Sequence, residues 1–297
     1  MYAHPYIIGI AGNSGSGKST IAKAILDVFT QDNTTVLCGD DMHKWERNDP
    51  NWNKYTHLNP NANNLELELK LLRTLSKGKT ISRNFYDHHT GTFTQPKLVE
   101  PTNLVILEGL HAFFLEKIRE IYKMLIFIKP APKLNQDWKI KRDTKERHKN
   151  KEKILAEIKN RENDFKDYIA TQEQYANIKI EFLYKKTQDL KSLEVKSNYP
   201  TADIYMLISL FNQPKIDSIV KTLESDSKLK INYFYQENFQ TFKAHGKVTI
   251  EEIKKLSDKV LPELKLFDKL NPNWHSGYIG IIQIIISYLL LRNGLKI

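Results

Sequence analysis

One complete phosphate-binding motif lies near the N-terminus of this sequence and restricts the fold more than any other feature. Residues 12–20 read GNSGSGKST and match the pattern G-x-x-x-x-G-K-[S/T] without a mismatch. The apolar run at residues 6–11 predicts a buried strand, and apolar residues at helical spacing in residues 21–29 predict a helix. A strand, a glycine-rich loop and a helix in this order predict a P-loop within an α/β sheet.

The residue types in this loop predict that it binds the phosphates of a nucleotide. Glycines let successive backbone N–H groups turn toward phosphate oxygens, and the N-terminus of the following helix adds partial positive charge. Lys18 is expected to reach the outer phosphates, and the Ser19 hydroxyl is expected to bind Mg²⁺. A glycine-rich turn that binds nothing is the alternative, which the complete motif disfavours. The expected nucleotide-binding residues are Gly12, Asn13, Ser14, Gly15, Ser16, Gly17, Lys18, Ser19 and Thr20.

Two further predicted strands lead into acidic residues. Residues 35–38 precede Asp40 and Asp41, and the apolar run at residues 103–109 contains Glu108 close to its end. Ligands bind beyond the carboxyl ends of parallel strands, so these acids should lie near the P-loop. Asp40 could accept the proton of an acceptor hydroxyl, although the Asp-Asp pair alone favours the alternative, a helix-capping or turn aspartate. Glu108 has the position of a Walker B acid, and the predicted metal ligands are Ser19, Glu108 and Asp40.

The region between these acids is predicted to be a loop, a helix and a hairpin. Residues 48–64 are polar and predict a loop, residues 65–75 have helical periodicity, and Thr-Gly-Thr at residues 90–92 predicts a hairpin. His88 and His89 beside the hairpin have no Cys or His partner at metal-binding spacing. We therefore expect them to contact a substrate or solvent rather than a metal ion.

A strongly basic segment follows a further predicted strand at residues 123–128. Residues 133–166 are predicted to be helical and contain a dense run of Lys and Arg. One interpretation is a solvated helix face, on which Asp143 and Arg147 form an ordinary i,i+4 pair. The other is a basic lid that closes over phosphates. Composition alone favours the first interpretation.

The last third of the chain contains no catalytic motif. A strand is predicted at residues 178–184, and residues 201–250 are predicted to mix short strands, such as residues 204–208, with polar turns. Helices are predicted at residues 248–266 and 278–291. The apolar run in the last of these is too short to span a bilayer and predicts a buried helix. The expected domains are a kinase core with its lid over residues 1–184 and a C-terminal α+β extension packed on it over residues 185–297.

Charge and cysteine content limit the partners and the compartment. The 45 Lys and Arg against 35 Asp and Glu give a formal charge of +10, which favours phosphates or nucleic acid as partners. The single cysteine excludes an intramolecular disulfide, and the N-terminus lacks a secretory signal pattern. We therefore expect a cytoplasmic protein without a membrane partner. Nucleic acid is not expected because no RNA-binding motif is visible, and a homodimer remains open.

Five further stretches match patterns of one known family. Residues 56–64, THLNPNANN, are similar to T-H-L-x-P-x-A-N-N, and residues 86–93, YDHHTGTF, resemble Y-N-H-x-T-G-T-F. Residues 107–111, LEGLH, match L/I-E-G-L-H, and residues 138–147, WKIKRDTKER, resemble W-K-I-x-R-D-x-x-E-R. GDDMH at residues 39–43, with Arg47, is similar to the segment that carries that family's aspartate base. Over about residues 6–182 the chain thus resembles the phosphoribulokinase/uridine kinase family, and it looks most like the phosphoribulokinases in it.

The resemblance implies a fold, a reaction and a set of site residues. The implied fold is α/β, a P-loop NTPase-type, mostly parallel sheet flanked by helices, with a basic helical lid and a C-terminal α+β extension. The implied reaction transfers the γ-phosphoryl group of ATP, with Mg²⁺, to a hydroxyl of a sugar phosphate, and ribulose 5-phosphate is the first candidate. Asp40 would be the base. The substrate-binding residues would be His43, Arg47, Tyr86, His88, Arg142 and Arg147.

The sequence also departs from the family pattern. His148 replaces a glycine, Thr171 replaces a proline and Asp87 replaces an asparagine. Ser16 stands where redox-regulated plant enzymes have a cysteine, so thiol switching is not expected.

Three alternatives to a phosphoribulokinase-like activity remain. The first is a uridine/cytidine kinase, although Thr-Gly-Thr at residues 90–92 stands where such kinases usually show His and Arg. The second is a kinase of another phosphorylated sugar or polyol. The third is a non-catalytic nucleotide-binding protein, against which the intact Lys18, Asp40 and Glu108 argue.

Overall fold

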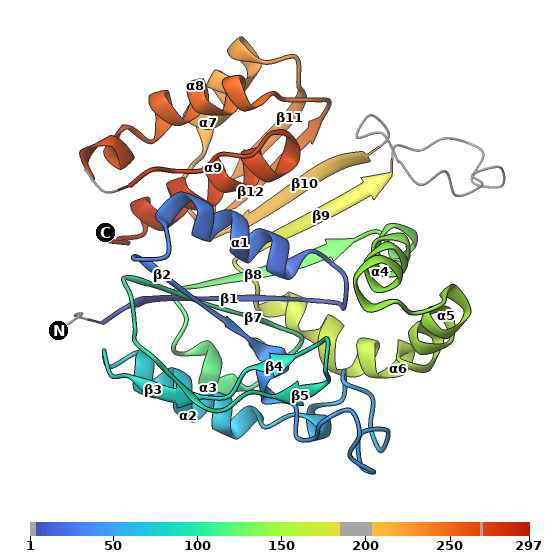
Figure 1. Ribbon diagram of the computed structural model, residues 1–297. Coiled ribbons are helices and arrows are strands. Elements are labelled where there is room, and N and C mark those ends of the chain that lie inside the picture. The colour runs from blue at the N-terminus through green and yellow to red at the C-terminus, as the bar shows by residue number, and fades with distance from the viewer. Residues whose placement is uncertain (1–3, 185–203, 268–269) are drawn as a thin grey trace.

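The computed structural model describes residues 4–184, 204–267 and 270–297. Its centre is an eight-stranded mixed sheet in the order β11-β12-β10-β9-β8-β1-β7-β2 (Figure 1). The strands from β9 to β2 pair in parallel, whereas β10, β12 and β11 extend the sheet antiparallel from β9. The strands are β1 (Tyr6–Gly12), β2 (Thr34–Cys38), β7 (Leu104–Gly109), β8 (Met124–Pro130), β9 (Ile178–Tyr184), β10 (Ile204–Phe211), β11 (Lys230–Gln236) and β12 (Phe239–His245).

Helices cover both faces of this sheet because its strands carry apolar side chains on both sides. Along β1, Ile8 and Ile10 pack into the core under α1, α7, α8 and α9, whereas Ile7 and Ala11 pack into the core under α2 and α3. The helices are α1 (Lys18–Phe29), α2 (Leu65–Leu75), α3 (Glu116–Arg119), α4 (Pro132–Arg147), α5 (Lys151–Asn160), α6 (Glu162–Asp164), α7 (Asp217–Asp226), α8 (Ile250–Val260) and α9 (Gly277–Arg292).

Two small antiparallel pairs lie outside the main sheet. One joins β3 (Ile81–Arg83) to β6 (Lys97–Val99), and the other joins β4 (Tyr86–Asp87) to β5 (Thr92–Phe93). The second pair is the hairpin that the sequence predicts at residues 90–92. Short non-α helical turns are η1 (Gly39–Met42), η2 (Pro60–Ala62), η3 (Phe165–Ile169), η4 (Ala170–Tyr175) and η6 (Pro262–Leu266).

The C-terminal third joins the same sheet and packs on α1 through α9. The expected boundary between residues 184 and 185 lies at an edge of the described residues. The predicted buried helix is confirmed as α9, which is packed against α1 and α8. Within the described ranges, no helix is long and apolar enough to cross a membrane.

Three local predictions need correction. The helix expected over residues 248–266 is wrong, because α8 ends at Val260 and Pro262 begins a separate 3₁₀ turn, since proline cannot donate the helical hydrogen bond. The mixture of strands and turns expected over residues 201–250 also contains α7. The continuous helical segment expected over residues 133–166 is interrupted at His148, whose φ of 51° is left-handed. A left-handed backbone explains why glycine suits that position in the family.

Candidate active site

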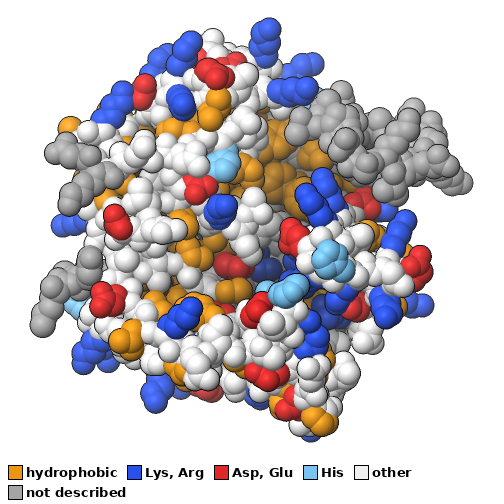
Figure 2. Space-filling model, viewed as in Figure 1, with side chains coloured by type: hydrophobic (Ala, Val, Ile, Leu, Met, Phe, Trp, Pro, Cys, Tyr) orange, Lys and Arg blue, Asp and Glu red, His pale blue; other side chains and the backbone are white. Residues whose placement is uncertain are grey.

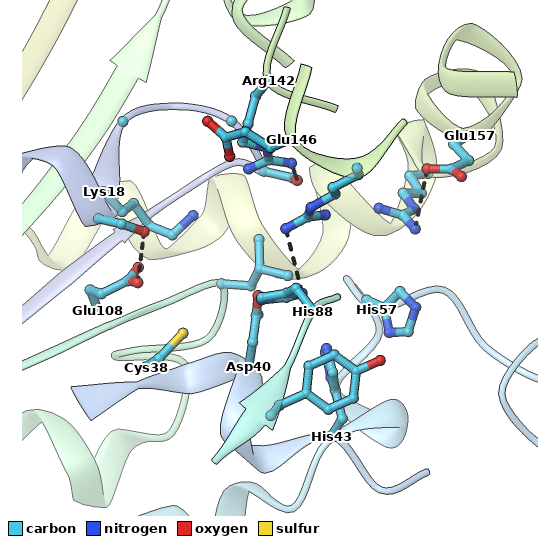
Figure 3. A pocket seen from close by; sticks show the side chains of 18 of the residues that line it. Lys18, Cys38, Asp40, His43, His57, His88, Glu108, Arg142, Glu146 and Glu157 are labelled. Carbon is cyan, nitrogen blue, oxygen red and sulfur yellow. Dashed lines mark hydrogen bonds and ion pairs between the residues drawn. The ribbon is translucent and has the colours of Figure 1, made fainter. Parts of the chain in front are cut away.

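The carboxyl ends of the parallel strands and helices α4 to α6 surround one large cavity of about 1470 Å³. The loop after β1 is the P-loop, Asp40 follows β2, and Glu108 lies at the end of β7. Figure 3 shows Asp40, His43 and His88 on one side of this cavity and Arg142 and Glu146 on the opposite side. The topology therefore brings together side chains that are far apart in the sequence.

Most of the residues predicted from the sequence line this cavity. Gly12, Asn13 and Ser16 do not line it. Ser16 is fully buried, and no hydrogen-bond partner for its hydroxyl exists among the described residues. The predicted residues that line the cavity are Ser14, Gly15, Gly17, Lys18, Ser19, Thr20, Asp40, His43, Arg47, Tyr86, His88, Glu108, Arg142 and Arg147.

The P-loop is docked against α4. Asn13 Nδ2 donates to Asn135 Oδ1 at 2.9 Å, and Asn135 Nδ2 donates to the Ser14 carbonyl at 3.2 Å. Gly15 has a φ of 77°, and a Cβ there would lie 2.9 Å from Lys139 Cβ. Only glycine avoids that clash in this backbone conformation. We refer to α4, α5 and their linker, residues 132–160, as the basic arm.

The predicted magnesium ligands Ser19 and Glu108 lie side by side. Ser19 Oγ donates to Glu108 Oε1 at 2.8 Å. No group of three or more His, Cys, Asp and Glu side chains within residues 4–184, 204–267 and 270–297 forms a metal cage. Mg²⁺ does not require such a cage, because it commonly binds one or two carboxylates together with water and substrate phosphates. Ser19, Glu108 and nearby Asp40 therefore fit Mg²⁺ that arrives with a nucleotide.

Lys18 is a buried cation between two acids. Its Nζ donates to the Asn13 carbonyl at 2.9 Å. Burial lowers the pKa of Lys18, and the charges of Glu108 and Asp40 oppose this shift. Burial also raises the pKa of Glu108, which Lys18 counteracts. A buried ammonium group of this kind has strong electrostatic interactions with any phosphate bound by the loop.

The neighbouring aspartates Asp40 and Asp41 have different surroundings. The Asp41 side chain is 5% exposed, and its Oδ2 lies 3.2 Å from Arg83 Nε. Asp41 Oδ1 accepts the Tyr86 backbone N–H at 2.7 Å. Asp40 keeps 29% of its side chain exposed and lines the cavity. Asp41 therefore holds the local structure together, and Asp40 is the carboxylate available to a bound molecule.

A chain of polar contacts connects Asp40 to the basic arm. His88 Nε2 lies 3.1 Å from Asp40 Oδ2, and His88 Nδ1 lies 3.5 Å from an Arg147 nitrogen. Burial raises the pKa of Asp40, but the hydrogen bond from His88 and nearby positive charge, including that of Lys18, outweigh burial and hold that pKa well below its usual range. Asp40 is therefore ionised at neutral pH and its orientation is fixed.

Arg47 holds the hairpin that carries His88. Its guanidinium nitrogens donate to the carbonyls of His88 at 2.6 Å and His89 at 3.3 Å. Gly91 has a φ of 80°, and a Cβ there would lie 2.6 Å from Arg47 Cβ. The structure thus places Arg47 on the cavity wall with its guanidinium group already engaged by backbone carbonyls.

Asp143 organises the basic arm and is not the ordinary surface partner of Arg147. Its carboxylate is fully buried, and Lys139 Nζ contacts Oδ2 at 2.5 Å. Arg142 Nη2 lies 2.7 Å from Oδ1, and Arg147 Nη1 lies 3.7 Å from the same oxygen. One buried carboxylate therefore holds three cations, two of which face the cavity.

We expect Asp143→Asn to lower the free energy of unfolding by about 2 kcal/mol at pH 7. Burial raises the pKa of Asp143, but Lys139 and Arg142 lower it to a net value of about 2, below the ordinary value of 3.8. A lowered pKa contributes stability above about pH 4, and that contribution is lost as the pH falls through about 2. Urea unfolding at pH 7, 5 and 3 measures the effect.

The matched control is Glu162→Gln, which removes an exposed pair with Lys166. We expect no measurable change from this substitution. Equal stability of Asp143→Asn and wild type at pH 7 would contradict the role of Asp143.

An aromatic wall, formed by His43, Trp52, His57 and Tyr86, faces the same cavity. The Trp52 and Tyr86 rings are stacked with centroids 5.9 Å apart, and the His43 and His57 centroids lie 4.6 Å apart. Burial lowers the pKa of His57 to about 3 and also lowers the pKa of His43. Both imidazoles are therefore neutral at pH 7.

Sequence reasoning missed part of this cavity. Trp52 lies in the stretch predicted to be a polar loop, and His57 lies in a quoted motif without an assigned role. Arg161 directly precedes α6 and lies beside Glu157, with 3.8 Å between Nη2 and Oε2. Arg161 follows the many charged residues of α5, so nothing in the sequence indicated that it lines the cavity. Figure 2 shows many Lys and Arg side chains over α4 and α5 on this face.

Comparison with known proteins agrees with this geometry. The model of the Phosphoribulokinase / Uridine kinase family matches residues 7–189, which contain the P-loop, Asp40, Glu108 and the basic arm. The chain belongs to this family.

Relatives with two different names match this chain. The phosphoribulokinase of Synechocystis sp. is 39% identical over 177 residues, which cover 60% of this chain and 53% of that protein. The chloroplastic phosphoribulokinase of Spinacia oleracea is 34% identical over 194 residues, 60% of this chain and 48% of that protein. The chain thus spans about half the length of these phosphoribulokinases. The uridine kinase of Lactobacillus johnsonii is 31% identical over 183 residues, 59% of this chain and 85% of that protein.

A solved structure extends the fold likeness to nearly the whole chain. The phosphoribulokinase from Rhodobacter spheroides has a TM-score of 0.63 and 16% sequence identity, and the match covers 94% of this chain and 99% of that chain. At this identity the likeness shows the fold alone, and it includes the C-terminal third that the family model does not reach.

Proposed function

We propose that this protein is an ATP-dependent kinase that phosphorylates a hydroxyl group of a sugar phosphate, with ribulose 5-phosphate as the first candidate. The proposal rests on one observation: several guanidinium groups line the same cavity as Asp40. Arg142, Arg147 and Arg161 line it from the basic arm and the start of α6. The names of the Synechocystis and spinach relatives support ribulose 5-phosphate as the acceptor.

The proposed mechanism assigns one task to each group of residues. The P-loop amides and Lys18 bind the triphosphate. Ser19 and Glu108 would hold Mg²⁺, which would supply positive charge to the phosphates. Asp40, oriented by His88, accepts the proton of the attacking hydroxyl. Arg142 contacts Ser14 Oγ at 3.3 Å, so its guanidinium group lies between the P-loop and the acceptor side. The basic arm acts as a lid that excludes water.

The guanidinium groups favour a phosphorylated acceptor over an uncharged one. Arg147 and Arg161 are partly removed from water, which lowers the pKa of both. Keeping them charged therefore has a desolvation cost while no phosphate is bound. A phosphate group would offset that cost through charge-assisted and often bidentate hydrogen bonds. A nucleoside such as uridine carries no phosphate and would leave this cost in place.

ADP release at saturating ATP tests the proposal. Ribulose 5-phosphate, ribulose, uridine and a panel of pentose and polyol phosphates are compared as acceptors. We expect the highest kcat/KM for a phosphorylated sugar and little activity with ribulose or uridine. Higher activity with uridine than with every phosphorylated sugar would overturn the proposal.

Uridine kinase is the second candidate because of the aromatic wall. The stacked Trp52 and Tyr86 rings and the neutral imidazoles of His43 and His57 could hold a nucleobase. The same acceptor panel separates the two candidates. The absence of ADP release with every acceptor would instead favour a non-catalytic nucleotide-binding protein.

Arg147→Ala is expected to raise the KM for the phosphorylated acceptor about 10- to 100-fold, because it removes a charge-assisted contact to the acceptor phosphate. The affinity for ATP should stay within about twofold, since Arg147 contacts His88 and Asp143 rather than the P-loop. Steady-state kinetics and ATP titration measure the two effects. Arg73→Ala on α2 lies outside this cavity and serves as the control. A variant that loses ATP affinity and keeps its acceptor KM would contradict this role.

A further inference from the structure

A buried glutamine fixes a segment of the C-terminal third onto α1. Gln283 is fully buried in the apolar helix α9. Its Nε2 donates to the Ala24 carbonyl at 2.8 Å and to the Asn273 carbonyl at 3.0 Å. Its Oε1 accepts the His275 backbone N–H at 2.8 Å. All polar atoms of this side chain are therefore used to hold the segment before α9 against the helix that follows the P-loop.

This attachment places the His275 ring against the cavity-facing side of α1. His275 Nε2 lies 2.7 Å from Asp27 Oδ2, and the two side chains are 40% and 17% exposed. Both residues line the cavity. Asp27 lies nine positions after Lys18, and at 1.5 Å per residue this places it about 13 Å further along α1. The pair is thus at the end of the cavity away from the phosphate-binding amides.

Three apolar residues line the same cavity as this pair. They are Ala24 on α1, Ile279 on α9 and Trp138 on α4, and they come from three different helices. Trp138 also packs edge-on against Phe182, with centroids 5.4 Å apart. Apolar and aromatic walls with one or two polar groups are the usual composition of a site for a heteroaromatic ring.

We propose that this corner, defined by Ala24, Asp27, Trp138, His275 and Ile279, is the base subsite of an adenine nucleotide and that His275 reads the base. The inference rests on the proposed function, because it assumes that the P-loop holds the triphosphate of that nucleotide. When the triphosphate is bound at the N-terminus of α1, the ribose and base extend along this helix toward the proposed subsite. The acceptor groups Asp40, His88 and Arg147 belong to the other side of the phosphates.

The hydrogen bonds of His275 give the base preference. In the tautomer whose Nε2–H donates to the Asp27 carboxylate, Nδ1 is an acceptor, and the hydrogen bond of the ring to Asp27 uses only Nε2. The exocyclic amino group of adenine can donate to that nitrogen. Guanine presents a carbonyl oxygen at the corresponding position, and two acceptors would then face each other. His275 is therefore a specificity-determining residue.

The test uses the full chain without any acceptor and measures binding of ADP, GDP and inorganic tripolyphosphate by calorimetry. His275→Gln is the main variant, because a glutamine amide can still donate to Asp27 while the Nδ1 acceptor is lost. We expect about tenfold weaker ADP binding and a smaller preference for ADP over GDP. Tripolyphosphate, which has no base, should bind as tightly as to the wild type. His275→Ala should weaken ADP binding at least as much.

Ser276→Ala is the control, since Ser276 is exposed and makes no side-chain cap to α9. It should leave all three affinities unchanged. Three results would overturn the inference: ADP affinity of His275→Gln within about twofold of wild type, an equal loss for tripolyphosphate, or wild-type binding of ADP no tighter than tripolyphosphate. Because no acceptor is present, the outcome is separate from the proposed acceptor. If the protein phosphorylates ribulose 5-phosphate but His275→Gln binds ADP as tightly as the wild type, the proposed function stands and this inference is wrong.

Discussion

Asp40→Asn is expected to lower kcat about 10²- to 10⁴-fold while ATP continues to bind. Asparagine has nearly the same shape as aspartate and can still bond to His88, but it cannot accept the proton of the attacking hydroxyl. The side chain is partly exposed to the cavity and lies 3.1 Å from His88 Nε2, so the substitution should not disturb the fold. Single-turnover phosphoryl transfer, ATP titration and thermal unfolding measure the three effects.

Two neighbouring aspartates provide the controls for Asp40. Asp87 bonds to the His89 backbone N–H at 2.8 Å within the hairpin and does not line the cavity. Asp87→Asn installs the residue that the family usually has there, and its activity should stay within a few-fold of wild type. Asp41→Asn should instead lower the unfolding temperature, because it weakens the buried pair with Arg83. A folded, fully active Asp40→Asn variant would move the base to another residue.

Local motifs predicted the core of the fold and the phosphate side of the site. The P-loop, the strand before Asp40 and the strand that contains Glu108 can each be recognised within about ten residues of sequence. Parallel strand order then requires their carboxyl ends to meet, so the contact between Ser19 and Glu108 follows from topology. The family resemblance added the acceptor side, including His88 and Arg147, which periodicity alone does not indicate.

The remaining parts of the site depend on tertiary contacts that no local pattern reports. His275 lies on the cavity only because Gln283, eight positions later, ties its segment to α1. Gln283 is visible in the sequence as a polar residue in an apolar run, but its partners are more than 250 positions away in one case. Trp52 likewise reaches the cavity from a stretch whose composition resembles an ordinary polar loop.

The character of the basic arm also needed the structure. Asp143 and Arg147 are spaced like a surface i,i+4 pair, and composition gives no reason to expect a carboxylate with no exposed area. The structure shows that Lys139 and Arg142 surround the same carboxylate. A run of charged residues that resembles a solvent-exposed helix face in the sequence can therefore form a buried network of ion pairs. The exposed fraction of the side chains distinguishes the two cases.

Lys18→Ala is expected to reduce phosphoryl transfer about 10²- to 10³-fold, because the ammonium group neutralises charge that develops on the transferring phosphoryl group. The fold should persist. Burial lowers the pKa of Lys18 in the folded chain, so the charged form costs native-state stability at neutral pH, and alanine removes that cost. The opposing loss is the contact to the Asn13 carbonyl and some side-chain packing. We therefore expect an unfolding temperature within a few degrees of wild type.

Single-turnover kinetics at saturating ATP, together with thermal unfolding, measure this effect, and Lys221→Ala on the exposed side of α7 is the control. The control should match wild type in both measurements. Loss of Lys18 also leaves Glu108 and Asp40 without the cation that counteracts their repulsion, so the pKa of Glu108 should rise further. A lower occupancy of Mg²⁺ at neutral pH would follow, and excess Mg²⁺ or a higher pH should recover part of the lost rate. A folded Lys18→Ala variant that turns over within tenfold of wild type would show that the P-loop lysine is not needed for transfer.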